Sequence, residues 1–331
     1  MAGWLRLLAM FLALTTAAGC RAQTSSPGRG APLVLERTIP LNGVHGRIDH
    51  LAVDVTHGRL FVAELGNGTV EAIDLARGAS LGRITELQAP QGLGYLPTLD
   101  ELVVASGGDG TVRFYRAADL APIGAVMLGA DADDVRIDPR SGRVVVGYGS
   151  GALAVIDPVT RTVVDRLALP AHPEGFELDG DRVIVNVPDA KRIIVGDLAS
   201  RRITASWTTD HGWNFPMAFD AASGVVTVVF RLPSRLQALK LASAASESDI
   251  ATCGDADDVF SDARRGRLYV ICGSGAVDVI GMADHDRLAR IASRSGARTG
   301  LFAPELDHLY VAARAGLPGD EAAILVFRPQ P

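Results

Sequence analysis

The sequence has no cluster of basic residues and, beyond its first twenty positions, no long apolar run. Its formal net charge is −6. Nucleic-acid surfaces need clustered Lys and Arg side chains to neutralise phosphates, so we expect no nucleic-acid partner. A helix that spans a bilayer needs about 20 consecutive apolar residues, so no segment after position 20 is expected to cross one.

Several motifs that carry chemistry are also absent. The sequence has no C-x-x-C-H haem attachment, no Walker A phosphate loop, no H-E-x-x-H zinc motif and no G-x-S-x-G nucleophile elbow. Its Gly-rich stretches, such as GNG and GSG, are short turns between apolar runs. These absences favour a protein that is not an enzyme, and any activity would have to come from residues distant in sequence.

Cysteine is scarce, with three residues in 331, and the first lies at the end of an export signal. A single early charge, Arg6, precedes the apolar stretch Leu7–Leu14, and small residues then lead to Cys20. Such an arrangement is typical of a secretory signal peptide, and small residues before a Cys resemble a bacterial lipobox. We predict a signal peptide over 1–19 and a lipid on Cys20. Cleavage without lipidation is the alternative, because Ala17 stands where such boxes usually have Leu.

Residues 20–31 are small, polar and rich in Pro and Gly, which predicts a flexible tether. The chain would be exported to the periplasmic side of the cell envelope and attached to the membrane through the lipid. Arg21 follows the Cys, where inner-membrane retention usually goes with Asp, so we predict an outer-membrane lipoprotein.

A repeat with a period near 42 residues runs through the rest of the chain. The clearest copies are DADDVRID (131–138) and DADDVFSD (255–262), in which an acidic stretch enters a short apolar run. Seven such apolar runs follow one another at spacings of 40 to 43 residues. The residues that immediately precede these runs are His50, Gln91, Asp134, Glu174, Met217, Asp258 and Thr299. Seven copies at this period are the signature of a β-propeller.

Each copy also repeats internally. In the first copy, four short runs, LAVD, LFVAEL, TVEAIDL and LGRITEL, are separated by turns that contain Asp, Gly and Asn. Short alternating or apolar runs between turn residues predict antiparallel strands, so each copy should form one four-stranded sheet. One such sheet cannot bury both faces alone, and stacking around an axis supplies the core.

The two ends of the repeat array complement each other. The seventh copy has only three strand-like runs, whereas PLVLERTIPL (32–41) precedes the first copy and has strand character. We therefore predict one domain, residues 32–331, in which the N-terminal strand completes the last blade. Closure of this kind removes an exposed sheet edge. The predicted fold class is all-β, a seven-bladed β-propeller with four-stranded antiparallel blades, and we expect a monomer.

The remaining two cysteines fall in the sixth copy. Cys253 precedes its first strand and Cys272 ends its second. Antiparallel neighbours bring the start of one strand beside the end of the next, and an exported chain meets an oxidising compartment. We predict a Cys253–Cys272 disulfide, with two buried free thiols as the alternative.

The units GRLFVAELGNGTVEAIDL (58–75) and GRVVVGYGSGALAVIDP (142–158) resemble the YVTN/YncE-like family of exported seven-bladed propellers. The resemblance extends over residues 32–328, although the Tyr-Val-Thr-Asn string itself survives only as variants such as LFVAELGN. It implies the propeller fold and a platform for docking, and it assigns no cofactor.

The innermost strands of a propeller line its central channel, so the residues that enter them from seven blades should gather at one mouth. The turns between second and third strands open on the same face. Our candidate ligand-binding residues on these segments are His50, Gln91, Asp134, Glu174, Asn214, Asp258 and Arg298, with Arg231 and Arg314 from the turns.

The carboxylates among them have three alternative interpretations. Hard divalent cations take oxygen ligands, so a metal site could use Asp133, Asp134, Glu174, Asp257 and Asp258. Close carboxylates also raise one another's pKa, which suits acid–base catalysis. The third interpretation is structural, with each Asp accepting hydrogen bonds from its own loop.

We therefore expect an exported, lipid-anchored binding or scaffold module that uses the polar mouth of its channel. The partner would be an envelope protein or a small molecule, and the only cofactor suggested is a divalent cation. The alternative is a metal-dependent hydrolase or lactonase-like enzyme that uses the same carboxylates.

Overall fold

The computed structural model describes residues 30–316 and 320–331. The predicted signal peptide (1–19), the lipidation site Cys20 and most of the tether lie outside the described residues. Residues Ala31–Pro331 form one compact unit, described here by itself. No helix within the described ranges has the length and apolar character that a membrane crossing requires.

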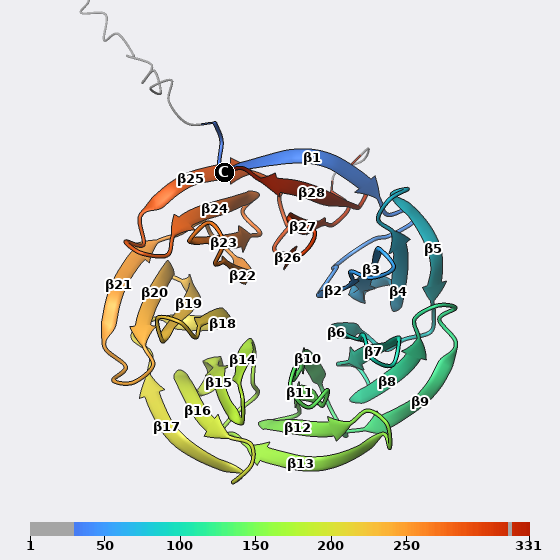
Figure 1. Ribbon diagram of the computed structural model, residues 1–331, viewed down its shortest axis with the longest axis horizontal. Coiled ribbons are helices and arrows are strands. Elements are labelled where there is room, and N and C mark those ends of the chain that lie inside the picture. The colour runs from blue at the N-terminus through green and yellow to red at the C-terminus, as the bar shows by residue number, and fades with distance from the viewer. Residues whose placement is uncertain (1–29, 317–319) are drawn as a thin grey trace, which may run out of the picture. The chain divides into compact units, whose positions relative to one another are not determined.

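The compact unit is a ring of seven four-stranded antiparallel sheets, which confirms the predicted fold class (Figure 1). Blade one holds β2 (Leu51–Asp54), β3 (Arg59–Glu64), β4 (Thr69–Asp74) and β5 (Ala79–Ile84). Blade two holds β6 (Pro90–Leu96), β7 (Glu101–Ser106), β8 (Thr111–Arg116) and β9 (Pro122–Met127). Blade three holds β10 (Ala132–Ile137), β11 (Val144–Tyr148), β12 (Ala152–Asp157) and β13 (Thr162–Ala168).

The remaining blades follow the same order. Blade four holds β14 (Phe176–Asp179), β15 (Arg182–Val187), β16 (Arg192–Asp197) and β17 (Arg202–Thr208). Blade five holds β18 (Gly212–Asp220), β19 (Val225–Leu232), β20 (Ser234–Lys240) and β21 (Ser246–Ala251). Blade six holds β22 (Ala256–Asp262), β23 (Arg267–Cys272), β24 (Ala276–Gly281) and β25 (Arg287–Ala292). Two short 3₁₀ helices, η1 (Leu65–Asn67) and η2 (Pro188–Ala190), lie in turns.

Blade seven is built from both ends of the domain. Its inner strands are β26 (Thr299–Ala303), β27 (His308–Ala313) and β28 (Ala323–Pro329), and its outer strand is β1 (Leu33–Pro40). The β1–β28 ladder runs from the pair Leu33 and Pro329 to the pair Pro40 and Ala323. The N-terminal strand thus completes the last blade, and the ring closes.

Burial follows the position of each strand in its blade. Every residue of β3 and β7 is buried, because both faces of these strands pack against neighbouring blades. The outer strand β13 instead alternates between exposed and partly buried residues along most of its length. Continuous apolar runs in the middle of each repeat and alternating runs at its end therefore have a common cause, the stacking of twisted sheets around an axis.

The aspartates in the turns at strand ends have a structural role. Asp74 Oδ1 accepts hydrogen bonds from the backbone N–H groups of Ala76 (2.8 Å) and Arg77 (3.0 Å). Asp157 does the same for Val159 and Thr160. These Asx turns satisfy backbone donors that a tight turn leaves without a strand partner.

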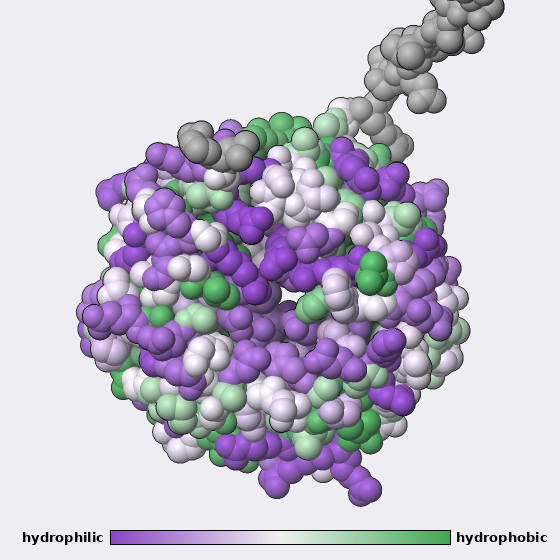
Figure 2. All heavy atoms as spheres, turned by 180° about the vertical axis from the view of Figure 1, so that it is seen from behind, coloured by the Kyte–Doolittle hydropathy of each residue, from purple (hydrophilic) through white to green (hydrophobic). Residues whose placement is uncertain are grey.

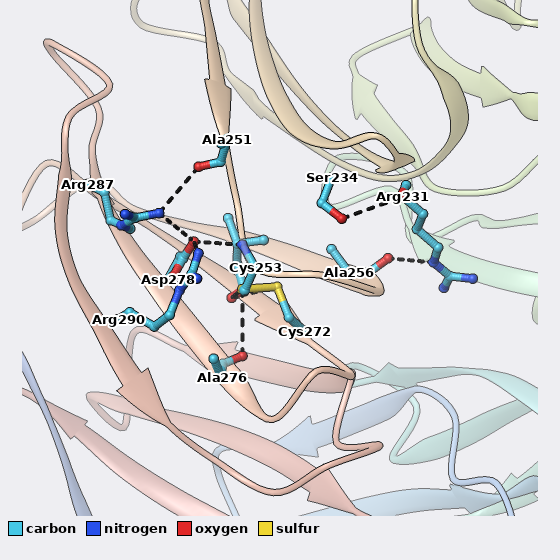
Figure 3. Close-up of a disulfide and its surroundings, with 11 residues drawn as sticks. Arg231, Ser234, Ala251, Cys253, Ala256, Cys272, Ala276, Asp278, Arg287 and Arg290 are labelled. Carbon is cyan, nitrogen blue, oxygen red and sulfur yellow. Dashed lines mark hydrogen bonds and ion pairs between the residues drawn. A yellow bond between two sulfur atoms is a disulfide. The ribbon is translucent and has the colours of Figure 1, made fainter. Parts of the chain in front are cut away.

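The predicted disulfide is present in blade six, with 5.8 Å between the Cα atoms of Cys253 and Cys272 (Figure 3). Both cysteines are buried. The fully buried carboxylate of Asp278 accepts a hydrogen bond from Cys253 N–H (2.8 Å) and two from Arg290 (Figure 3). The start of the loop that enters β22 is therefore held both covalently and by a charged hydrogen-bond network.

Arginines link neighbouring blades on the turns between first and second strands. Arg265 in blade six donates to both carboxylate oxygens of Asp307 in blade seven (2.7 and 2.9 Å) and to Asp262 of its own turn (3.0 Å). Arg59 makes the equivalent connection from Asp54 in blade one to Asp100 in blade two. Each arginine and its partner in the next blade are 41 or 42 residues apart, about one period, so these links join successive repeats.

Replacing Arg265 with Ala should lower the free energy of unfolding by about 2 kcal/mol, because it leaves buried Asp262 and its neighbour Asp307 without their shared cation. Thermal or urea unfolding measures the change. Arg264→Ala is the matched control, since this exposed side chain lies 3.9 Å from Asp307 and should change stability by less than about 0.5 kcal/mol. Equal effects of the two substitutions would contradict the blade-linking role.

Candidate functional site

A polar cavity of about 230 Å³ lies where the innermost strands converge. Blades one, three, four, five, six and seven all contribute to its lining. Figure 2 shows hydrophilic side chains around a hollow at the centre of one face of the ring. The lining includes Arg47, Asp49, His50, Asp133, Asp134, Arg136, Glu174, Glu177, Phe215, Asp257 and Asp258.

A left-handed residue recurs where the chain turns into the innermost strand. Ala89, Asp131, Trp213, Asp255 and Gly296 have φ values of 50°, 38°, 60°, 61° and 81°. They occupy the same position of the repeat in five of the seven blades. For residues other than Gly this conformation costs about 1 kcal/mol, so it persists only where the surrounding structure requires it. In blades three, five and six it precedes a cavity-lining side chain by two residues.

Bulges then bring adjacent acidic residues to the same cavity. In blade three, Ala132 pairs with Tyr148 and Val135 with Val146, which leaves one extra residue on β10. In regular pleating, Asp133 and Asp134 would point to opposite faces, but a bulge re-aims one of them. β22 of blade six has an extra residue at the same point, next to Asp257 and Asp258. The two near-identical acidic stretches therefore form two matched parts of the cavity wall.

His50 connects the acidic side chains of three blades. Its Nε2 atom lies 3.1 Å from Asp134 Oδ1 and 3.9 Å from Asp49 Oδ1, and its Nδ1 atom lies 4.0 Å from Asp258 Oδ1. Burial disfavours the charged imidazolium, but the carboxylates of Asp134, Asp49 and Asp258 outweigh it and raise the pKa of His50 to about 10. His50 is therefore a cation at neutral pH.

Asp134 and Asp258 each have a second partner, and their pKa values move apart. Burial alone would raise the pKa of Asp134, but Arg136 (Nη1 to Oδ1, 3.3 Å) and His50 hold it below its usual value. Asp258 Oδ2 accepts a hydrogen bond from Gly300 N–H in blade seven (2.7 Å). Burial nevertheless raises the pKa of Asp258 to about 7, against the attraction of His50.

The carboxylates of blade four have no such partners. The carboxylates of Glu174 and Glu177 make no hydrogen bond or ion pair with any residue that the structure describes, although both residues line the cavity. Burial, reinforced by Asp133 and Asp134, raises the pKa of Glu174 to about 8. Burial raises the pKa of Glu177 to about 6. Near neutral pH Glu174 therefore holds a proton because burial disfavours its carboxylate, whereas Glu177 is mostly ionised.

Asp133 lines the cavity and also lies close to His172. The Nε2 atom of His172 lies 3.9 Å from Asp133 Oδ2, and His172 Nδ1 lies 2.6 Å from the backbone oxygen of Gly149. Burial raises the pKa of Asp133 to about 6, although His172 opposes the shift. Burial would lower the pKa of His172, but Asp133 and Gly149 raise it to about 9.

Arginines dominate the opposite side of the mouth. Arg231 stacks over the ring of Phe215 at 4.0 Å and forms an ion pair with Asp257. Arg298 Nε lies 2.8 Å from Asp257 Oδ2, and its Nη1 atom lies 3.2 Å from Asp255 Oδ1. A small hollow of about 40 Å³ lies beside the cavity and is lined by Arg47, Arg298, Arg314, Asp255, Ile48, Gly296 and Ala312.

The structure thus places the predicted ligand-binding residues at three locations. His50, Asp134, Glu174 and Asp258 line the cavity. Arg231, Arg298 and Arg314 lie at its rim or in the adjoining hollow. Gln91 and Asn214 line neither.

Asn214 and Gln91 were predicted to line the mouth of the channel, and local packing keeps each of them out of it. Asn214 is fully buried, and its Nδ2 atom donates to Asn186 Oδ1 and to Arg192 O (both 3.1 Å), so it joins blades four and five. Gln91 precedes Gly92, where even a Cβ atom would collide with the backbone oxygen of Asp133. The innermost strand of blade two packs directly against blade three, and blade two contributes no lining to the cavity.

Sequence reasoning missed Arg47 and Glu177. Glu177 is a charged residue inside a short apolar strand run, FELD, as Arg136 is in VRID. Charged residues within innermost strands are a signal for channel-facing positions, because the apolar neighbours of the same strand face the blade interfaces. Arg47 lies in the loop that enters β2, and the equivalent positions in blades three and six are Asp131 and Asp255, so the repeat does not indicate a basic residue there.

The five carboxylates predicted to bind a metal do not include three whose ligand atoms all lie within 4.8 Å of one another. Within residues 30–316 and 320–331, the group whose ligand atoms all lie within 4.8 Å is instead Asp54, His57 and Asp100. The guanidinium of Arg59 forms ion pairs with both aspartates of that group, so it already supplies the positive charge. Binding of a metal by the cavity stays a prediction.

Comparisons with known proteins identify the fold alone. No family model matches the sequence, and no curated protein is similar to it. Among solved structures 1771 chains match. A chain of the "Crystal Structure of Mitotic Checkpoint Complex" is 14% identical with a TM-score of 0.76, and the match covers 98% of each chain.

The raised pKa values predict that stability falls as pH rises from about 5 to 9. Between the ordinary pKa of Glu174 and its folded value of about 8, the folded state holds a proton that the unfolded chain releases, so deprotonation favours unfolding. Asp133, Asp258 and His50 act in the same direction. Glu174→Gln should therefore flatten the decline of Tm with pH and gain stability relative to wild type above pH 8.

Thermal unfolding at pH 5 to 9 measures both profiles. Glu305→Gln, on an exposed turn of blade seven, is the control and should leave the wild-type slope unchanged. Parallel profiles for wild type and Glu174→Gln would show that Glu174 does not carry the proton.

Proposed function

We propose that this protein is an exported, lipid-anchored binding module, without catalytic activity, that uses the polar mouth of its central cavity. The observation that supports the proposal is the charge of the lining: seven carboxyl side chains face the cavity with only Arg47, Arg136 and His50 as cations. Membership of the YVTN/YncE-like family of exported propellers is part of the same proposal and rests on the repeat units of the sequence.

The charge imbalance favours a ligand that carries positive charge. Charged groups lose hydration on burial, and carboxylates without a cation take up protons instead. Burial raises the pKa of Glu174 to about 8 and that of Asp258 to about 7, the latter in spite of His50. A bound cation would replace those protons, so its affinity should increase with pH up to about 8, where Glu174 ionises. A divalent metal ion and a small organic amine both satisfy this requirement.

The dimensions of the cavity favour a small ligand. Its volume of about 230 Å³ is below the roughly 300 to 1,000 Å³ that drug-sized ligands occupy. An envelope protein could also dock on the mouth and insert one basic side chain. Rigid strands carry most of the lining residues, so the site would need little ordering when the ligand binds.

A metal-dependent hydrolase or lactonase-like enzyme is the second candidate. One observation favours it, since Asp258 and Glu174 have pKa values of about 7 and 8, which suit a general acid or base near neutral pH. It has less support than binding, because the cavity carboxylates within the described residues do not form a compact set of three metal-ligand groups.

Cation binding should raise the Tm of the purified propeller. The probes are Ca²⁺, Mn²⁺, Zn²⁺ and putrescine, each tested at pH 6 and pH 8. Asp134→Asn and Glu174→Gln should weaken binding of the effective probe about 10-fold or more, a loss of about 1.4 kcal/mol. Glu305→Gln should leave binding unchanged, because Glu305 is exposed outside the cavity.

The same samples test the enzyme candidate with a panel of lactones and esters. Turnover that disappears in Asp258→Asn would replace the binding proposal with the hydrolase. If no probe shifts Tm and no turnover is seen, the cavity does not bind the proposed class of ligand.

Replacing Cys20 with Ser tests the proposed anchor. The wild-type chain expressed in a Gram-negative host should incorporate labelled fatty acid and sediment with outer membranes, because a lipidated Cys holds it there. Cys20→Ser should lose the label and appear in the soluble periplasmic fraction. Release of the wild-type chain as a soluble, unlabelled protein would contradict lipidation and support cleavage alone.

A further inference from the structure

The mouth of the cavity has two electrostatic sides. Blades three and four supply Asp133, Asp134, Glu174 and Glu177, with Arg136 as the lining arginine on those blades. The other side carries the arginines of blades five, seven and one. The arginines on that side are Arg47, Arg231, Arg298 and Arg314.

Within the described residues, three of the four arginines on this side form ion pairs with carboxylates, and Arg314 does not. Arg231 and Arg298 share Asp255 and Asp257, and Arg47 lies 2.9 Å from Asp49. Arg314 forms no ion pair with any residue in the described part of the chain, and it lines the small hollow that adjoins the cavity. Arg47 lines both spaces, so the cavity and the hollow share a wall.

A buried carboxylate oxygen next to this wall has an ion pair but no hydrogen bond. Asp49 is 2% exposed and lines the cavity. Its Oδ2 atom lies 2.9 Å from Arg47 Nη2 and accepts no hydrogen bond from the described residues. Buried carboxylate oxygens normally accept hydrogen bonds, so Asp49 offers an acceptor to a donor that enters the cavity.

We propose that the ligand is a small zwitterion, which places an ammonium group among the cavity carboxylates and an oxyanion on the rim arginines. This inference rests on the proposed function and specifies its ligand. An ammonium group carries three donors for the cavity carboxylates, of which Glu174 has no ion-pair partner among the described residues. A guanidinium fork matches the paired oxygens of a carboxylate or a phosphate, and Arg314 presents such a fork in the hollow beside Arg298, whose own fork is held by Asp255 and Asp257.

The test is a matched series of compounds measured by titration calorimetry. The series contains ω-amino carboxylates from glycine to 6-aminohexanoate, aminoalkyl phosphates of two and three carbons, and the alkylamines of equal length. We expect at least one zwitterion to bind about 10-fold more tightly than its matched alkylamine. The carboxylate and phosphate arms of the series identify the oxyanion.

Variants separate the two sides of the mouth. Arg314→Ala should remove the advantage of the zwitterion and leave alkylamine affinity unchanged, whereas Glu174→Gln should weaken both. Arg314→Lys should restore only part of the advantage, because a lysine has charge without the fork. Arg294→Ala is the matched control, since Arg294 lines neither space and donates to the backbone oxygen of Glu321.

The outcomes distinguish this inference from the proposed function. Equal affinity for amine and zwitterion, or an Arg314→Ala variant that keeps the advantage, would overturn the zwitterion and leave a cation site. Binding of Ca²⁺ or Mn²⁺ without any zwitterion would do the same. If neither metals, amines nor zwitterions bind, the inference and the proposed small-ligand function are both wrong.

Discussion

The pairing of β1 with β28 is the interaction on which the rest of the structure depends. Without β1 the seventh blade would have three strands and an open edge, and the core that blades seven and one share would lose Ile39 and Leu41. Cavity residues come from six different blades, and only a closed ring sets their distances. At the mouth, Thr299 Oγ1 donates to Ile48 O (3.2 Å) and so joins the last blade to the first. Closure is thus a condition for the site as well as for stability.

The cavity itself works against stability, and this is informative about its role. Buried carboxylates cost free energy unless cations or donors compensate them, and a protein selected for stability alone would use apolar residues there. Here five residues enter strands through left-handed turns and two bulges aim adjacent aspartates into one space. Strain and uncompensated charge that converge on one hollow are typical of sites shaped by a ligand. Between the blades, by contrast, large clusters of buried apolar side chains pack against one another.

Much of the fold could be predicted because its determinants are local and repeated. The spacing of apolar runs, the turn residues and the missing fourth strand specify seven blades and their closure, and the disulfide follows from strand order. The site was harder to predict, because it depends on one-residue shifts. Asn214 belongs to a strand whose bulge begins directly after it, so its side chain faces the neighbouring blade and not the axis. Gln91 does not reach the cavity because the next residue, Gly92, packs closely against the backbone of Asp133 in blade three, a contact that the repeat pattern does not predict. Arg47 stands where two other blades have Asp131 and Asp255, so the repeat gave no sign of its charge.

The position of β1 has a mechanical consequence. The chain ahead of Pro32 leads directly into the closing strand, whose first pair, Leu33 with Pro329, adjoins the C-terminus. Tension applied through that leading segment would peel β1 away one hydrogen-bonded pair at a time, and such unzipping needs less force than shearing a whole strand at once. The ring would then part between its last and first blades, at the junction beside His50 and Gly300. Tension on the tether would therefore loosen the cavity before the other six blades separated.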